Sequence, residues 1–193
     1  MVDDDSTDGT KEIAAQANLE AVVKQTGSGL AQAWNQGIQL GSNDFVAIID
    51  SDDYWSPTFL SSCLETFARF PGAQCVITKT KFVLAASNVP SGFRPELVNA
   101  EQIGWIPGAT LFRRSVFQRV GLFPEDLKVA CDIEWFARLR EQSVDVALLP
   151  ALGLYKRIHG ANLSLSGTDP EVYRREILQV ARRRRESAPS RDS

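Results

Sequence analysis

Cysteine and histidine are scarce in this sequence, and their scarcity argues against several kinds of site. The 193 residues include three cysteines, Cys63, Cys75 and Cys131, and a single histidine, His159. Because the cysteine count is odd and no CxxC pair occurs, neither a disulfide framework nor a zinc knuckle is expected. Thiols in this pattern favour a reducing compartment, so we expect a cytoplasmic protein.

Long hydrophobic runs are missing as well. The longest nearly apolar stretch, residues 146–155, is interrupted by Pro150 and Gly153. It is much shorter than the roughly 20 residues that a membrane-spanning helix needs. Acidic residues follow Met1 almost at once, which is unlike a signal peptide. These features predict a soluble chain.

Neither sign of charge dominates the chain. There are 21 Lys and Arg residues against 24 Asp and Glu residues, which gives a formal net charge of -3. This balance does not favour a nucleic-acid-binding protein, which would normally be strongly basic. An acidic protein that handles an anionic substrate needs a cation or a local basic pocket.

Arginine is concentrated near the C-terminus. Residues 169–193 contain seven arginines and five acidic residues, and Asp169 followed by Pro170 is typical of a helix start. We expect a basic helix there and a short tail at 187–193. A solvated charged face is one interpretation of this helix, and weak contact with the anionic inner face of a membrane is the other. The change in composition divides the chain into a main domain, 1–168, and a C-terminal basic helix and tail, 169–193.

Strand and helix patterns alternate along the main domain. Helical spacing predicts helices at 11–17, 30–40, 113–120 and 131–142, and after Ser56 and Pro57, with Ser56 as the N-cap. Short apolar runs predict strands at 20–24, 45–49, 74–78, 82–86, 109–112 and 144–149, with a long loop at 87–104. The alternation predicts an α/β fold in which helices flank a mainly parallel sheet.

Acidic residues directly after the apolar run at 45–49 are the central chemical feature. In an open α/β sheet, ligands bind at the carboxyl ends of the strands. On an extended backbone Asp50 and Asp52 would face one ligand together, while Ser51 and Asp53 would point elsewhere. Two nearby carboxylates repel each other unless a hard divalent cation joins them, and Mg²⁺ fills its other positions with water and phosphate oxygens. The pattern indicates metal-assisted binding of a diphosphate.

A plainer interpretation of these acids stays open at this point. Acidic residues after a strand can simply cap the next helix, although Ser56 already lies in that position. A bare DxD pattern is also common. The N-terminal acids Asp3, Asp4, Asp5 and Asp8 equally fit a polar turn before a helix.

Six segments nevertheless carry motifs that occur together in one family. They are VDDDSTDGT at 2–10, AWNQGI at 33–38, IDSDDYWSP at 49–57, GATLFRRSVFQRVGLF at 108–123, CDIEW at 131–135 and YKRIHGANLS at 155–164. In this order they resemble the family 2 glycosyltransferases over about residues 2–165, and the resemblance implies a GT-A-like (Rossmann-like) fold. Asp5 stands where the first motif has glycine, and Trp34 where the second often has Arg.

The resemblance implies roles for individual acids. Asp4, with Asp3 beside it, matches the acid that reads the nucleotide base, usually uracil. Asp52 matches the principal ligand of a divalent metal, Mg²⁺ or Mn²⁺, and Asp50 assists it in holding the diphosphate. Asp132 matches the general base that takes the proton from an acceptor hydroxyl. The implied reaction moves a sugar from a nucleotide-diphosphate sugar, with UDP the expected nucleotide, to an unknown acceptor with inversion.

Two positions of the later motifs have competing interpretations. His159 matches a histidine that reaches the metal or the diphosphate, whereas a lone histidine is more often structural. Cys131 replaces the usual Glu of the family, and Asp132 itself would also suit a helix N-cap.

The family has a strand and a helix before its first motif, and this chain begins at that motif. A start placed too late, a truncated gene, or a partner chain that supplies the strand in a homo-oligomer would each account for this. We therefore expect the chain alone to be a weak or inactive transferase. The alternatives are a catalytically impaired GT-A fragment that serves as a nucleotide-binding module, and a haloacid-dehalogenase-like phosphatase, whose strand also ends in DxD.

Overall fold

The computed structural model describes residues 1–163, 165 and 169–187 of the chain. The α-helices within these residues are α1 (Thr10–Gln16), α2 (Leu30–Leu40), α3 (Phe59–Arg69), α4 (Ser115–Val120), α5 (Cys131–Glu141) and α6 (Pro170–Ser187). The strands are β1 (Val2–Asp3), β2 (Val23–Lys24), β3 (Phe45–Ala47), β4 (Tyr54–Trp55), β5 (Cys75–Leu84), β6 (Glu101–Ile103), β7 (Thr110–Arg113) and β8 (Val146–Ile158). Two short 3₁₀ turns lie at Pro95–Leu97 and Pro107–Ala109.

A six-stranded sheet forms the centre of the fold, in the order β3-β7-β5-β8-β4, with β6 also paired to β5. The β5–β8 pair is parallel, and the other pairs of this sheet are antiparallel. The expected GT-A-like α/β fold is confirmed, but the sheet is mixed and not mainly parallel. The strands β1 and β2 form a separate parallel pair.

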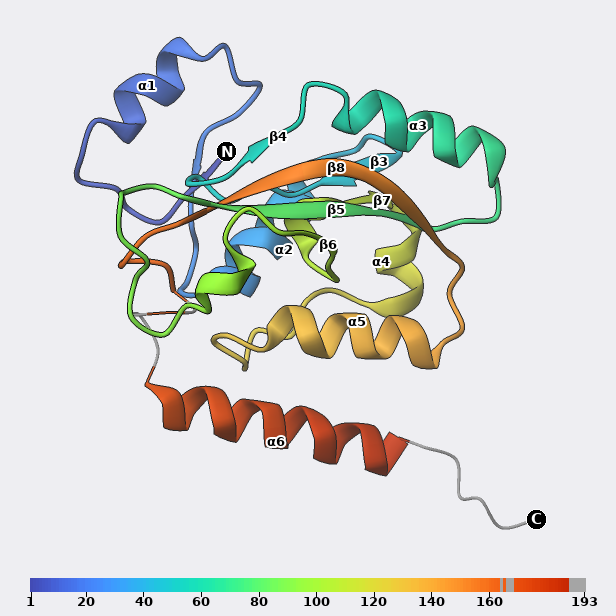
Figure 1. Ribbon diagram of the computed structural model, residues 1–193. Helices are drawn as coiled ribbons and strands as arrows, with labels where there is room; N and C mark the ends of the chain where they lie inside the picture. The colour runs from blue at the N-terminus through green and yellow to red at the C-terminus, as the bar shows by residue number, and fades with distance from the viewer. Residues whose placement is uncertain (164, 166–168, 188–193) are drawn as a thin grey trace.

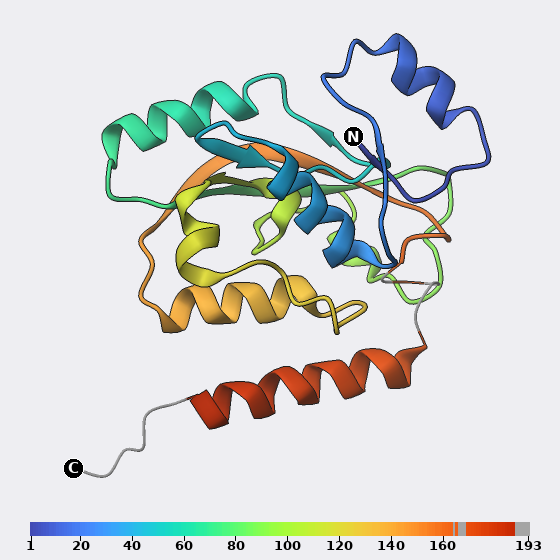
Figure 2. The same ribbon diagram turned by 180° about the vertical axis from the view of Figure 1, so that it is seen from behind.

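Both faces of the central sheet are buried, because residues next to each other on a strand supply opposite cores. Cys75, Ile77 and Phe112 belong to the larger core, whereas Val76 and Leu111 face the smaller one. Figure 1 shows α3 over one face and α2, α4 and α5 on the other, with α6 outside α5, and Figure 2 shows the same layers from behind. Trp135 of α5 is fully buried at the centre of the larger core.

The strand β8 is much longer than the segment 144–149 that the apolar pattern predicted. It continues through Pro150 and Gly153 because its register with β5 shifts twice, between Ile77 and Lys79 and between Lys79 and Thr80. Extra residues in β8 take up these shifts, and proline is tolerated in such bulges. Gly153 is required by close approach, since a Cβ there would lie 2.1 Å from the hydroxyl of Thr78. The extended β8 carries residues 155–158 to the acidic turn.

The observed bounds of three other segments also differ from the predicted ones. The predicted strands 74–78 and 82–86 are one strand, β5, and the expected loop at 87–104 contains the short strand β6. The helix expected after Ser56 begins at Phe59, with Thr58 as its N-cap and no side-chain cap. In contrast, α2 occupies residues 30–40 as predicted.

The C-terminal helix α6 packs against the domain. Val180 is 5% exposed within the larger core, and Ile177 packs against the same cluster. The boundary proposed at residue 168 and the last motif residue, Ser164, lie outside the described residues. The same holds for residues 188–193 of the tail expected at 187–193, whereas Ser187 ends α6. No helix in the described part of the chain combines the length and the apolar character needed to cross a bilayer.

Candidate functional site

The acidic turn lies between β3 and β4, at the point where the chain crosses to the far edge of the sheet. The amide of Asp53 donates to the carbonyl of Asp50 at 3.1 Å, so residues 50–53 form a turn and not an extended segment. One carboxylate oxygen from each of Asp50, Asp52 and Asp53 lies within 4.8 Å of the others. The prediction that Asp53 points elsewhere is wrong, because the alternation it assumed applies only to extended backbone.

Lys156 of β8 neutralises part of this cluster. Its Nζ lies 2.9 Å from the carboxylate of Asp53 and 3.4 Å from that of Asp50. The side chain of Asp53 is only 2% exposed, and the backbone N–H of Arg157 donates to its carboxylate at 2.9 Å. Burial raises the pKa of Asp53 although Lys156 opposes the shift, and the three carboxylates hold the pKa of Lys156 above its usual value against the effect of burial.

Asp52 is held from the turn that follows β8. His159 Nε2 lies 3.0 Å from Asp52 Oδ2, and the amide of Asn162 donates to the same oxygen at 3.1 Å. The backbone N–H of Ala161 donates to His159 Nδ1 at 3.2 Å, which assigns the proton to Nε2 in the neutral ring. In this arrangement His159 donates a hydrogen bond to Asp52. Binding a metal through Nε2 would require that proton to move.

These acids fit a hard divalent cation by the chemistry of their donors. Mg²⁺ and Mn²⁺ prefer carboxylate oxygens, and oxygens within 4.8 Å of one another can surround one ion. Asp50 and Asp52 are about one-third exposed, whereas Asp53 is buried against Lys156. Asp50 and Asp52 are therefore the better placed ligands, and Asp53 supports the turn.

Asp132 lies at the start of α5, one residue after the helix begins. Its carboxylate accepts the N–H of Ile133 at 2.7 Å. Burial raises its pKa to about 6, with a smaller contribution from the negative charge of Asp50, while Lys156 opposes the shift. The structure therefore places Asp132 within electrostatic reach of the acidic turn. A carboxyl with this pKa is ionised at neutral pH and basic enough to accept a proton.

The N-terminal acids behave differently from one another. Asp3 is 5% exposed and accepts hydrogen bonds from the backbone and the hydroxyl of Ser6, so it stabilises its own loop. Asp4 is exposed on the turn after β1. Among the described residues, neither acid makes a hydrogen bond or ion pair with the Asp50 cluster. The structure gathers Asp50, Asp52 and His159 into one site, with Asp132 near it.

Three supporting residues escaped the sequence analysis. Asp53 was misplaced by the alternation argument, and Lys156 was missed because its strand was expected to end at residue 149. Asn162 carries no signal on its own, although it lies within the motif at 155–164. Lys156 was the easiest of the three to predict from the sequence, because a basic residue inside a motif of an acidic site is expected to pair with the acids.

Sequence relatives identify the family of this chain. The model of the family described as Glycosyl transferase family 2 matches residues 1–121. Chondroitin synthase of Escherichia coli is 25% identical over 177 residues, which cover 88% of this chain and 26% of the relative. Glycosyltransferase AglE of Haloferax volcanii is 29% identical over 149 residues, covering 72% of this chain and 49% of the relative. The chain thus spans about a quarter to a half of the length of these relatives.

Solved structures agree on the fold. Staphylococcus aureus TarS 1-349 in complex with UDP has a TM-score of 0.67 at 22% identity, covering 97% of this chain and 55% of that chain. Glucosyl-3-phosphoglycerate synthase of Mycobacterium tuberculosis has a TM-score of 0.60 at 17% identity, covering 98% and 69%. The structural likeness shows the GT-A-like fold, the family match covers more than half of the residues, and on these grounds the chain belongs to glycosyl transferase family 2.

Proposed function

We propose that this chain transfers a sugar from a nucleotide-diphosphate sugar to an acceptor hydroxyl, with inversion at the anomeric carbon. One observation carries the proposal. The carboxylates of Asp50, Asp52 and Asp53 gather at the end of β3, and Asp132 lies close enough for Asp50 to raise its pKa. This arrangement supports a metal site beside a proton acceptor, and the family match supports glycosyl transfer as its use.

The reaction divides its work between the acids. Asp52 and Asp50 would hold Mg²⁺ or Mn²⁺, with His159 as a further ligand if its Nε2 proton moves to Nδ1. When bound, the metal supplies charge stabilisation for the leaving diphosphate. Asp132 takes the proton from the acceptor hydroxyl as that oxygen bonds to the anomeric carbon. The bond from the sugar to the diphosphate oxygen breaks, and the nucleotide leaves with the electron pair.

The nucleotide is proposed to be uridine diphosphate. TarS has been solved in complexes with UDP and with UDP-GlcNAc, which supports this choice without identifying the sugar. Asp4 is the proposed partner of the base, because it is exposed and charge-assisted hydrogen bonds to a ring N–H are strong. Asp3 would then position Asp4 through the loop bonds to Ser6.

The test measures UDP release from UDP-GlcNAc with Mn²⁺, with and without added sugar acceptors. Asp132→Asn should lower kcat by about 10²-fold or more, because the proton has no acceptor. Asp52→Asn should abolish the increase in UDP release that added Mn²⁺ gives in the parent chain. Asp44→Asn is the matched control, since Asp44 is an exposed acid before the same strand. Equal activity in all of these variants would refute the assignment.

A nucleotide-binding module without turnover is the second candidate. It is favoured by Lys156, whose ammonium group already neutralises two of the carboxylates, and by the separation of β1 and β2 from the central sheet. Calorimetry with UDP and Mn²⁺ separates the two, since binding without UDP release supports the module. Membership of the glycosyltransferase family argues against the phosphatase alternative.

Location and partners complete the proposal. The three cysteines are free and buried, which supports a reducing, cytoplasmic compartment. Arginines on α6, such as Arg174 with 74% exposure, support weak contact with an anionic membrane surface. The strand β3 lies at the edge of the central sheet, where a second copy could add a strand in a homo-oligomer.

A further inference from the structure

A buried carboxylate from α6 binds the segment that enters α5. Glu176 is only 4% exposed, and its Oε1 accepts the backbone N–H of Lys128 at 2.9 Å. Its Oε2 accepts the N–H of Val129 at 2.9 Å and of Ala130 at 3.1 Å. One side chain therefore fixes three successive backbone groups directly before the helix that carries Asp132.

The start of α5 has no capping side chain of its own. The N-cap is Ala130, which forms no side-chain cap, and the carboxylate of Asp132 bonds to Ile133. Ser, Thr, Asp or Asn would normally fix the backbone at this position. Glu176 supplies a comparable restraint on the N-cap Ala130 and the two residues before it, from a helix more than 40 residues away in sequence.

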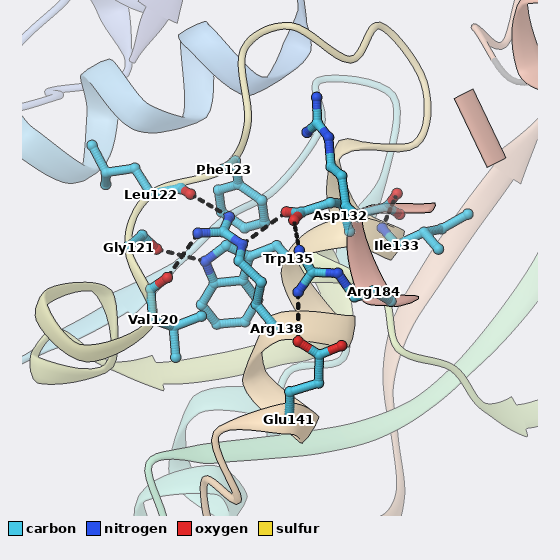
Figure 3. A network of polar contacts seen from close by, with 12 residues as sticks. Val120, Gly121, Leu122, Phe123, Asp132, Ile133, Trp135, Arg138, Glu141 and Arg184 are labelled. Carbon is cyan, nitrogen blue, oxygen red and sulfur yellow. Dashed lines mark hydrogen bonds and ion pairs between the residues drawn. The ribbon is translucent and has the colours of Figure 1, made fainter. Parts of the chain in front are cut away.

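Further contacts tie α6 to the same region. Gln179 and Arg183 of α6 both bind Asp126, in the loop between Phe123 and α5. Arg184 binds Glu141 at 2.7 Å, near the end of α5, as Figure 3 shows. It also binds the buried Glu134 at 2.8 Å. The helix thus holds α5 at both ends and the loop that leads into it.

The opposite side of α5 is held as firmly. Figure 3 shows Arg138 of α5 reaching the carbonyl oxygens of Val120 and Leu122, each at 2.7 Å. Trp135 donates its indole N–H to the carbonyl of Gly121 at 2.7 Å. With these contacts the body of α5 cannot shift easily. The segment 128–130 is then the part of the helix entrance whose position depends on Glu176.

We propose that α6 clamps the entrance of α5 and that Glu176 is the positioning residue that fixes Asp132 for proton transfer. This rests on the proposed function of Asp132. Asp132 is two residues from Ala130, so a change in the backbone at 128–130 rotates or shifts its carboxylate. General-base catalysis is sensitive to such shifts, because a displacement of about 1 Å can lower the rate by about 10²-fold.

Glu176→Gln is the informative change, because it keeps the size of the side chain. The amide group of Gln presents N–H to backbone N–H, so at least one of the three bonds is lost. We expect kcat to fall by about 10- to 100-fold, with the donor KM unchanged. Glu171→Gln on the same helix is the matched control, because Glu171 is 78% exposed and should leave kcat unchanged.

Amide hydrogen exchange makes the test independent of turnover. The amides of residues 128–130 should exchange about tenfold faster in Glu176→Gln than in Glu171→Gln, with the sheet unchanged. Unchanged exchange at 128–130 would refute the clamp. Faster exchange with unchanged kcat would refute the positioning role. If the parent chain transfers no sugar, the proposed function of Asp132 fails, and the exchange data still decide the clamp.

A second variant keeps the test usable if Glu176→Gln unfolds. Asp126 is 57% exposed and contacts α6 through Gln179 and Arg183, so Asp126→Asn loosens the same loop without a buried change. We expect faster exchange at 128–130 and a fall in kcat of about two- to threefold. An Asp126→Asn protein with parental exchange and parental kcat would contradict the clamp.

Discussion

Asp132 should set the acidic limb of the pH–rate profile. Burial raises its pKa to about 6, and a general base works only when ionised. For a pKa of about 6 the ionised fraction is about 0.9 at pH 7 and about 0.1 at pH 5. The value of kcat should therefore fall about tenfold between these pH values, with a midpoint two units above that of an ordinary aspartate.

The assay is UDP release at saturating donor and Mn²⁺ between pH 5 and 8, with KM followed separately because metal binding also weakens in acid. Asp44→Asn should keep the limb, since Asp44 is exposed and precedes β3, outside the acidic turn. The residual activity of Asp132→Asn should show no limb near pH 6. A limb that survives this substitution, or a parental midpoint near pH 4, would show that Asp132 is not the base.

The same shift has a consequence for stability. Because the pKa of Asp132 is higher in the folded chain than the ordinary 3.8, the folded state holds its proton more tightly. The resulting stabilisation is present in acid and is lost as the pH rises from about 4 through about 6. At pH 7.5 Asp132→Asn removes an ionised, desolvated group, so its Tm should equal or exceed that of the parent. Lower activity with an undiminished Tm would separate catalysis from folding.

Three further predictions concern the support of the site. Gly153→Ala should lower the free energy of unfolding by about 1–3 kcal/mol in urea titrations, whereas Gly160→Ala, whose Cβ meets nothing within 4 Å, should not. Lys156→Met leaves the buried carboxylate of Asp53 without its charged partner and should cost about 3 kcal/mol. Lys79→Met, at a more exposed ion pair, should cost under about 1 kcal/mol in the same titrations. Chelation with EDTA should stop UDP release, and added Mn²⁺ should restore it; activity that persists in EDTA contradicts the metal site.

Patterns with strong local causes were predictable from the sequence. The helix α2 was predicted with its observed bounds, because Gly29 and Gly41 bracket a run with helical spacing. The helix predicted at 113–120 ends at Val120 as expected, because Gly121 follows it with a φ of 86°, a positive value that glycine adopts readily. The position of the acidic cluster was predicted for a similar local reason, because aspartates directly after a buried strand lie at the edge of the sheet.

Strand direction and length depended on partners that the local pattern does not reveal. The run at 109–112 has the same apolar character whether it pairs parallel or antiparallel, so the mixed sheet could not be read from it. The extension of β8 depends on Gly153 passing close to Thr78, a contact between residues 75 positions apart. Proline at position 150 argued for a break, whereas the register shifts with β5 absorb it.

The supports of the site show why the motif and the mechanism occupy different parts of the chain. The family match ends at residue 121 and contains Asp50, Asp52 and Asp53. The charge that balances these acids comes from Lys156, and the proposed base is Asp132. Both reach the acidic turn through long-range packing, Lys156 by the pairing of β8 with β4 and β5, and Asp132 by the docking of α5. In the proposed function, the acids before residue 121 would hold a diphosphate through a metal, and transfer would need the segment after residue 121, which supplies the proposed proton acceptor Asp132.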